Sequence, residues 1–249
     1  MKKSIILLIL IFGLFTLLPS RAFSQAQNVQ DILEKMIDAQ GGRAALEKIE
    51  DTVLTGYMEM VQMGLGGSLT TYQKEPNKLR LDATVQGTVV TQTFDGESGW
   101  MSNPMTGLNE EMPPIIATDF GRSALGNDAL LDPDKYGITY TLKGKELIEG
   151  KEYFVLSQNF SDGFKATLLI DNKTYLMYKT INTSINEVGE EIEVETILSD
   201  YKNIEGIFIS HTLVTYQDGS EFMRMTITEV EFNTGLDDTW FILKEEKMI

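Results

Sequence analysis

The sequence predicts a mainly β fold of the α+β class, with about eleven antiparallel strands in a single domain. Apolar and polar residues alternate over most of the chain beyond residue 50, which is typical of strands that bury one face. Turn residues separate these segments, and three of the turns share an Asp-Gly pair. Helical spacing is confined to the start of the mature chain and to one Pro-containing segment. No linker interrupts residues 50–240, which favours one domain.

The first 24 residues are predicted to be a cleaved export signal. Lys2 and Lys3 precede an apolar run over residues 5–18, and residues 22–24 offer the small side chains that a signal peptidase reads. The run is short for a membrane span, and an uncleaved N-terminal anchor is the alternative. Residues 25–249 would then form the folded domain.

The composition narrows the choice of partners and of compartment. The chain has no cysteine, so we expect no disulfide and no lipid-accepting residue after the signal. Loss of the cations Lys2, Lys3 and Arg21 with the signal takes the formal net charge from −16 to −19. Such a charge argues against nucleic acid and against docking on anionic lipid head groups. We therefore expect a soluble, monomeric periplasmic protein that is not lipid-anchored.

Two short helices are expected at the start of the mature chain. The apolar residues within 29–37 repeat at helical spacing, Asn28 is placed to cap the first turn, and Gly41 with Gly42 ends the helix. Residues 43–50 form a second helical piece. The apolar stripe is predicted to be core.

Residues 103–137 interrupt the run of strands. Four prolines in this segment are incompatible with a continuous sheet ladder, and short helical turns are expected near residues 116–125 and 127–131. A segment of this length inside a β domain serves either as a lid or binding loop or as a plain structural crossover. The residues leave both possibilities open.

The segment from Leu79 to Phe94 is predicted to be a hairpin that turns at Gln86-Gly87. Because side chains alternate along a strand, this register gives one polar and one apolar face. Trp100 follows a turn predicted to span five residues, which would place it opposite Phe94 and on the apolar face. The other members of that face are Leu79, Leu81, Ala83, Val85, Val90 and Phe94.

Further strands are expected on both sides of this hairpin. Residues 52–61 and 69–74 precede it, and strands resume at Ile138 and continue almost to the end of the chain. The last hairpin is expected to turn through the three residues 217–219. One face of this hairpin would hold Ile207, Ile209, His211, Leu213, Met223, Met225 and Ile227.

The residues offer little for catalysis. His211 is the only histidine and lies in an apolar strand, so we expect a core or rim residue rather than a catalytic one. The absence of cysteine and the single histidine argue against a zinc site, and the carboxylate pairs lack the spacing of a calcium loop. We therefore expect no enzyme activity, no metal site and no cofactor.

Methionine is the remaining compositional signal, with 12 in the chain. Unbranched thioethers adapt to irregular apolar partners and recur at promiscuous binding surfaces. Filling of an ordinary core is the alternative explanation, and methionine alone favours it. The methionines on or beside predicted strands are Met58, Met60, Met63, Met101, Met105, Met112, Met177, Met223 and Met225.

The order of the elements and turns resembles a known group. An export signal leads into "GGRAALEKIEDTVLTGYMEM", and "PNKLRLD", "FDGESGWMSNPMTG", the helical crossover and "LLIDNKTYLMYKT" follow. The chain closes on "LSDYKNIEGIFISHTLVTY" and "VEFNTGLDDTWFIL". This sequence is similar to the outer-membrane lipoprotein-sorting proteins, the LolA-like superfamily, from about residue 28 to 243.

The resemblance implies an unclosed antiparallel half-barrel of about eleven strands, with helices covering its concave, apolar face. The cavity there would bind the acyl chains of a lipoprotein or lipid. Sorting carriers of the group hold their closed state with an arginine near the cavity. Neither Arg80, on the polar face of the hairpin, nor Arg122, in the crossover, matches it. The residues expected to line the cavity are Leu54, Met58, Met60, Leu79, Leu81, Val90, Phe94, Trp100, Leu213, Met223 and Met225.

Two functions are compatible with these observations. The first is a soluble periplasmic carrier for lipid or lipoprotein, in which burial of acyl methylenes supplies the affinity. The second is a non-enzymatic β-rich interaction or scaffold protein of the cell envelope, whose cavity is filled by its own side chains. Envelope proteins are possible partners in both cases.

Overall fold

The structure is a computed structural model that describes residues 28–185 and 190–243. The predicted export signal, residues 1–24, lies outside the described residues. Within the described ranges, no helix is long and apolar enough to cross a membrane.

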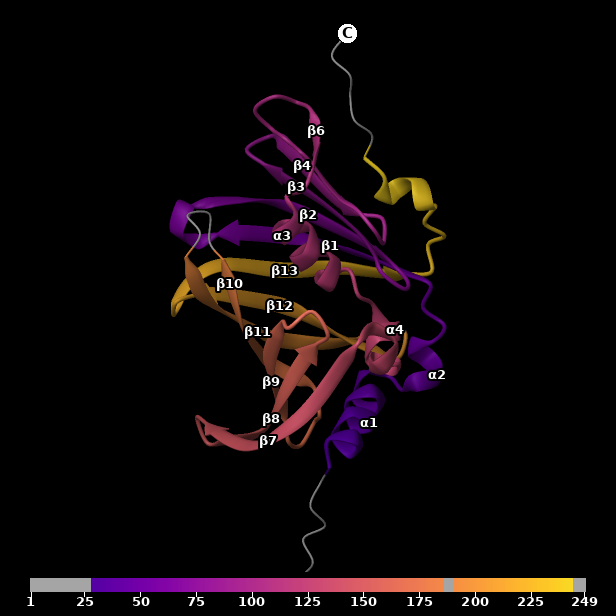
Figure 1. Ribbon diagram of the computed structural model, residues 1–249, viewed down its shortest axis with the longest axis vertical. Helices are drawn as coiled ribbons and strands as arrows, with labels where there is room; N and C mark the ends of the chain where they lie inside the picture. The colour runs from indigo at the N-terminus through magenta and orange to yellow at the C-terminus, as the bar shows by residue number, and fades with distance from the viewer. Residues whose placement is uncertain (1–27, 186–189, 244–249) are drawn as a thin grey trace, which may run out of the picture.

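Thirteen strands form one antiparallel sheet in the order β6-β5-β4-β3-β2-β1-β13-β12-β11-β10-β9-β8-β7 (Figure 1). The sheet ends at β6 and β7, so it is not closed into a barrel, as predicted. The structure has thirteen strands where about eleven were expected, and one of the additional strands, β6, forms inside the segment for which only helical turns were expected. The strands are β1 (Asp51–Met60), β2 (Leu65–Lys74), β3 (Lys78–Val85), β4 (Thr88–Phe94), β5 (Gly99–Ser102), β6 (Asn109–Glu111), β7 (Ile138–Ile148), β8 (Lys151–Phe160), β9 (Lys165–Asp171), β10 (Met177–Ile185), β11 (Glu191–Ile204), β12 (Ile207–Gln217) and β13 (Ser220–Phe232).

The helices are short, and most of them lie on one face of the sheet. The Asn28 side chain caps α1 through the backbone N–H of Asp31, and Gly41 ends the helix, as the sequence predicts. In Figure 1, α3 is seen over β1 and β2, and α4 lies beside α2. The helical elements are α1 (Val29–Gln40), α2 (Arg43–Leu46), η1 (Val61–Met63), α3 (Pro114–Ser123), α4 (Asn127–Leu131), η2 (Pro133–Tyr136) and η3 (Asp238–Phe241).

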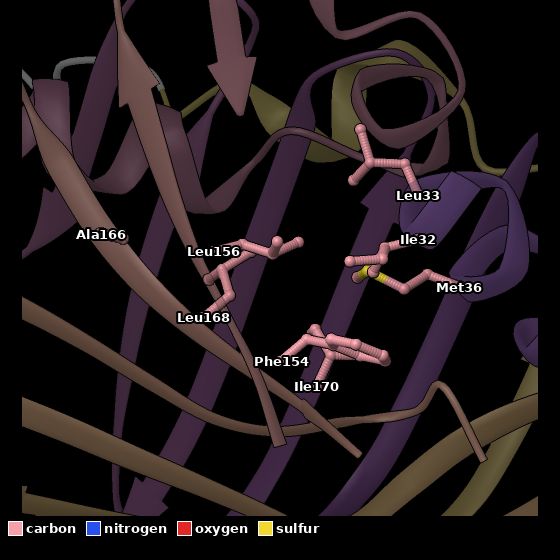
Figure 2. Close-up of a cluster of buried hydrophobic side chains, with 8 residues drawn as sticks. All are labelled: Ile32, Leu33, Met36, Phe154, Leu156, Ala166, Leu168 and Ile170. Carbon is pink, nitrogen blue, oxygen red and sulfur yellow. The ribbon is translucent and has the colours of Figure 1, made fainter. Parts of the chain in front are cut away.

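The main core lies between α1 and the β8–β9 hairpin (Figure 2). Phe154 and Leu156 alternate along β8, and the register pairs them with Ile170 and Leu168 of β9, so all four point to the same side. The apolar stripe of α1 covers them, which confirms that this stripe is core. We call this side of the sheet the helix face and the opposite side the outer face. The α1 side chains in the cluster are Ile32, Leu33 and Met36.

The predicted register of the β3–β4 hairpin is confirmed. Leu79 pairs with Phe94 and Val85 with Thr88. Gln86 and Gly87 have φ values of 51° and 84°, which is the left-handed geometry of a two-residue hairpin turn. Such a turn matches the twist of the strands and fixes which side chains share a face.

Trp100 is a correction to the prediction. It pairs with Thr93, and Gly99 takes the predicted place opposite Phe94. The turn has four residues rather than five, because the Asp95 carboxylate accepts hydrogen bonds from the backbone N–H groups of Glu97 and Ser98 and tightens it. A shift of one residue moves a side chain to the other side of a sheet. Trp100 therefore lies on the outer face.

The last hairpin also turns more tightly than predicted. Gln217 pairs with Ser220, so the loop holds only Asp218 and Gly219, both with positive φ. A register irregularity at the start of β13 compensates for the shorter loop. The side chains predicted to share one face therefore still do so, and Leu213 lies opposite Met225.

The C-terminal segment packs on the outer face. Trp240 lies against Tyr72, with 5.1 Å between ring centroids, and Arg80 donates a hydrogen bond to the Trp240 carbonyl oxygen. Arg80 is thus on the outer face, as expected for the polar side of the hairpin. Lys74 and Lys78 both pair with Asp238. This end of the chain is tied to the sheet by charge as well as by ring contacts.

Asp51 organises the loop that leads to this segment. Its buried carboxylate accepts four hydrogen bonds, from the hydroxyl and N–H of Thr234 and from the N–H groups of Gly235 and Leu236. Burial alone would raise the pKa of Asp51, but these donors outweigh it and hold the pKa below its ordinary value.

We expect Asp51→Asn to lower the free energy of unfolding by about 2 kcal/mol at neutral pH, because two or more charge-assisted hydrogen bonds lose strength. The folded pKa is depressed, so this stabilisation is present above the unfolded value of about 3.9 and is lost as pH falls through the folded value. Urea unfolding of both proteins at about pH 7 and about pH 3 measures this. The exposed substitution Asp134→Asn is the control, with a change under about 0.5 kcal/mol. A difference that persists at low pH would contradict the assignment.

Candidate ligand cavity

Half-buried apolar side chains cross the middle of the helix face. Met58 of β1 pairs with Met225 of β13, which pairs with Leu213 of β12, and Met60 pairs with Met223 one row further along. We call these five residues the methionine face. Each is only partly buried, so apolar surface remains open to a ligand.

The other residues predicted to line a cavity also share the helix face, with one exception. Leu54 pairs with Thr71, which pairs with Leu81, and this row continues the alternation of the methionine face. The β3–β4 register adds three more, of which Leu79 is buried. Trp100 is the exception, on the outer face. The three are Leu79, Val90 and Phe94.

A cavity of about 370 Å³ lies under the helices, where the two parts of the sheet come together. Its wall includes Gln73 of β2 and Thr180 of β10, which belong to strands on opposite sides of β13 in the sheet. The volume falls within the range of roughly 300–1,000 Å³ that is typical of small-molecule pockets. Its apolar lining includes Met36, Leu125, Leu130, Ile138, Phe160, Leu168 and Met177.

A second cavity of about 340 Å³ lies between α3 and the β8–β9 turn. Phe94 is the only residue of the predicted set that lines either of these two cavities. Arg122, Leu125 and Phe160 line both, so the two spaces meet at these side chains. Sequence reasoning missed them, although the alternation of Phe154, Leu156 and Phe160 along β8 marks an inward-facing strand.

The first cavity also carries polar groups. Gln158 donates a hydrogen bond of 2.9 Å to the Tyr140 hydroxyl oxygen. Burial raises the pKa of Tyr140, although the bond from Gln158 opposes the shift. The phenol therefore stays protonated at neutral pH and can donate a hydrogen bond to an oxygen of a ligand.

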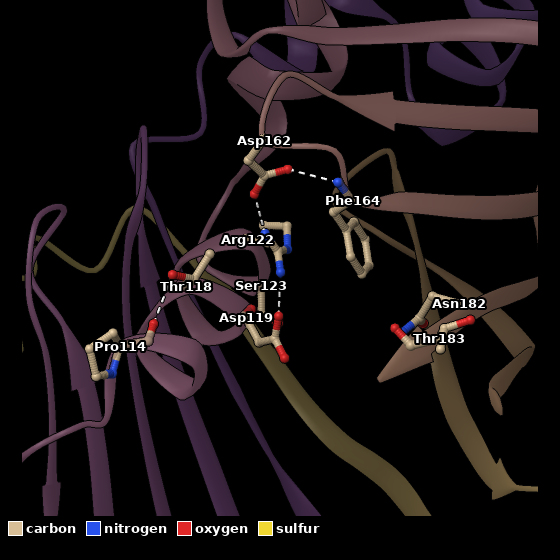
Figure 3. A network of polar contacts seen from close by, with 9 residues as sticks. All are labelled: Pro114, Thr118, Asp119, Arg122, Ser123, Asp162, Phe164, Asn182 and Thr183. Carbon is tan, nitrogen blue, oxygen red and sulfur yellow. Dashed lines mark hydrogen bonds and ion pairs between the residues drawn. The ribbon is translucent and has the colours of Figure 1, made fainter. Parts of the chain in front are cut away.

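Arg122 joins α3 to the β8–β9 turn, which belongs to the other part of the sheet (Figure 3). Its guanidinium forms ion pairs with Asp119, one turn earlier in α3, and with Asp162 in the β8–β9 turn. It also stacks over the Phe164 ring, 4.2 Å from the centroid. A planar guanidinium suits both carboxylate and ring contacts. This bridge connects the β8–β9 turn to α3, which otherwise packs on β3, β4 and β5, and Arg122 lines both cavities.

The neighbouring helix α4 is held by a separate contact. The Glu75 carboxylate, in the β2–β3 turn, accepts hydrogen bonds from the backbone N–H groups of Asn127 and Asp128 at the start of α4. Burial raises the pKa of Glu75, and the two N–H donors oppose this. The two helices α3 and α4 therefore have separate attachments to the rest of the molecule.

Small residues let α3 approach the sheet closely. A Cβ at Gly121 would lie 2.8 Å from Cζ of Phe94, which is too close for a real contact. At Gly99 of β5, a Cβ would lie 3.2 Å from Cβ of Ala117. The helix α3 therefore rests directly on one residue of the predicted cavity, Phe94, and a side chain at position 121 would push the two apart.

We expect Gly121→Val to lower the free energy of unfolding by about 1–3 kcal/mol more than Ser123→Val does. Both changes place a valine in α3, and helix propensity favours the change from glycine, but Ser123 is exposed and its hydroxyl bonds within the same helix, to the Asp119 carbonyl oxygen. Amide hydrogen exchange should be faster throughout α3 in the first variant only. Equal stability of the two variants would show that α3 does not rest on Phe94.

His211 is buried on the helix face, as expected for a core residue. Its Nδ1 donates to the carbonyl oxygen of Ile209, 2.9 Å away, which fixes the proton on that nitrogen. Within residues 28–185 and 190–243, no three His, Asp or Glu side chains gather in a way that would hold a metal ion.

Comparisons with known proteins bear on the fold. No family model matches the sequence, and a search of curated proteins finds no match. Among solved structures, a LolA superfamily protein from Nitrosomonas europaea is similar with a TM-score of 0.60, 13% identity, and coverage of 87% of this chain and 98% of that one.

Two further solved structures are similar to this chain in fold. A DUF1329 family protein from Desulfovibrio piger has a TM-score of 0.59 and 16% identity, over 86% of this chain and 97% of that one. A putative outer membrane lipoprotein-sorting protein domain from Vibrio parahaemolyticus has a TM-score of 0.57 and 17% identity, over 84% and 95%. Identities this low carry information about the fold alone. The chain therefore has the open, helix-covered antiparallel sheet of LolA superfamily and lipoprotein-sorting proteins.

Proposed function

We propose that this protein is a soluble periplasmic carrier that binds the acyl chains of a lipid or lipoprotein on the helix face of its sheet. The acyl chains contact the methionine face and reach the two cavities beside α3. No bond is broken in this function, and burial of methylenes at about 0.8 kcal/mol each supplies the affinity.

One observation carries the proposal. The five residues of the methionine face form one apolar surface and are only half-buried, whereas α1 covers the β8–β9 part of the helix face with a packed core. An apolar surface left open in this way is typical of a binding site rather than of a closed interior. Methionines suit a ligand of variable shape, since their side chains are flexible and unbranched.

In this proposal, Arg122 controls access to the apolar surface by holding α3 in place. Its contacts with Asp162 and Phe164 link α3 to the β8–β9 turn, and both cavities meet at its side chain. Breaking the contacts would free α3 to move away from the β8–β9 side.

A scaffold protein without a lipid ligand is the second candidate. The packed cluster under α1, where Met36 and Leu168 meet, favours it, because this part of the helix face is filled by the chain's own side chains. Titration of the delipidated protein with a fluorescent fatty acid, below the micelle concentration, separates the two. A saturable signal supports the carrier, and a signal that never saturates supports the scaffold.

A further inference from the structure

Three of the strand-connecting turns differ from all the others in charge. The turns β1–β2, β3–β4 and β5–β6 contain no charged residue, and neither do the strand ends beside them, over residues 60–68, 83–93 and 99–109. The other seven turns that the structure describes in full each hold at least one charged residue. These residues are Glu75, Asp95, Glu149, Asp162, Lys173, Glu205 and Asp218.

The three uncharged turns lie next to one another. Strands β1 to β6 are consecutive in the sheet, and β1, β3 and β5 run in the same direction, so the turns that follow them leave the sheet at one end. Figure 1 shows these turns along one side of the molecule. With about 4.8 Å between strands, neighbouring turns are about 10 Å apart and the three span about 20 Å. We call them the neutral tips.

The neutral tips expose large apolar side chains. Met105 is 90% exposed and Met63 is 61% exposed, in two different tips, and Val89, which is 55% exposed, lies on β4 two residues after the β3–β4 tip. Tyr57, on the outer face of β1 near the first tip, is 62% exposed and brings a ring with a polar end. Apolar residues gathered on or beside three adjacent turns mark an interaction surface, whereas scattered ones need no explanation.

The charges of the chain and of the neutral tips indicate what kind of surface the tips bind. A chain with a net charge of −16 is repelled by anionic surfaces, and burying charged turns in an interface would cost desolvation energy. The neutral tips avoid both costs at a surface that is itself neutral. Glu59 and Glu110 lie on the strands behind the tips, and Asp218 lies in the β12–β13 turn, which leaves the sheet beside the β1–β2 tip at the same end.

The tips also adjoin the proposed ligand site. Met60 of the methionine face is the last residue of β1, immediately before the β1–β2 turn. We infer that the neutral tips insert into the interface of a lipid bilayer with zwitterionic head groups and bring the open end of the helix face to the membrane. This inference extends the proposed function but rests on a different set of residues.

The test is flotation of the full mature protein with phosphatidylcholine vesicles. The unaltered protein should float with the vesicles, and Met63→Asp and Met105→Asp should each lower the partition coefficient about tenfold, because each removes the burial of one methionine. Leu147→Asp is the matched control. Leu147 is 71% exposed on β7, the strand at the opposite edge of the sheet, and its replacement should change nothing. Phosphatidylglycerol added to the vesicles should weaken binding.

Three results would overturn the inference: no flotation of the unaltered protein, tighter binding to anionic vesicles, or an equal loss with Leu147→Asp. Absence of flotation would point to a protein partner at the tips. Titration with the fluorescent fatty acid keeps the two proposals distinct, because the Met63 and Met105 variants should bind it as well as the unaltered protein does. Loss of that binding in these variants would assign the tips to the ligand site instead.

Discussion

Met225→Glu is expected to reduce the affinity for a fluorescent fatty acid at least about tenfold. Met225 lies at the centre of the methionine face, between Met58 and Leu213. A carboxylate there would have to be buried against an acyl chain without a partner, and the apolar contact of the thioether would be lost as well.

The neighbouring residue supplies the matched control. Thr226 follows Met225 on the same strand but points to the outer face, where it is exposed and pairs with Tyr57. Thr226→Glu adds the same charge within one residue of the site, and we expect unchanged affinity. Thermal unfolding of both variants checks that each is folded. Equal losses of affinity would place the ligand away from the helix face.

Arg122→Leu is expected to accelerate amide hydrogen exchange in α3 about tenfold and to speed the release of bound fatty acid. The substitution removes the ion pair with Asp162 and the ring contact with Phe164, which join α3 to the β8–β9 turn, and an ion pair with Asp119 inside α3. Asp119 and Asp162 are almost half exposed, so solvent screens the ion pairs. Together with the stacking on Phe164 we assign them about 1–2 kcal/mol, which corresponds to roughly a tenfold change.

Lys145→Leu is the control for this prediction. Lys145 also combines an ion pair, with Glu152, and a ring contact, with Phe154, but all its partners belong to the same β7–β8 hairpin. Its loss should leave exchange in α3 unchanged. Unaltered exchange in the Arg122 variant would mean that α3 is held by its packing on β3, β4 and β5.

The sequence predicted strand faces where a turn leaves one choice of register. Gln86-Gly87 allows only a two-residue turn, and the faces of β3 and β4 followed from it. The prediction for Trp100 was wrong, because the Asp95 side chain tightens the preceding turn through hydrogen bonds that the sequence alone does not specify. One residue of difference in loop length was enough to move the tryptophan to the other side of the sheet.

The cavity residues could not be predicted from the sequence, for a different reason. Arg122 and Asp162 are 40 positions apart, and the contact depends on how far the sheet curls rather than on any local pattern. The need for glycine at position 121 arises only from its contact with Phe94, which lies on a strand 27 positions earlier in the chain. The methionine face was predictable, since period-two alternation in β1, β12 and β13 determines it.

Mass spectrometry of what the delipidated protein extracts from bacterial membranes tests the central claim most directly. The protein is incubated with membranes, separated from them, and its bound molecules are identified, with Met225→Glu treated in parallel. The account predicts that the unaltered protein carries acyl-chain lipid or lipoprotein at close to one ligand per chain and that Met225→Glu carries much less. An unaltered protein that leaves the membranes without any acyl-chain ligand, or a variant that extracts as much as it does, would contradict the account.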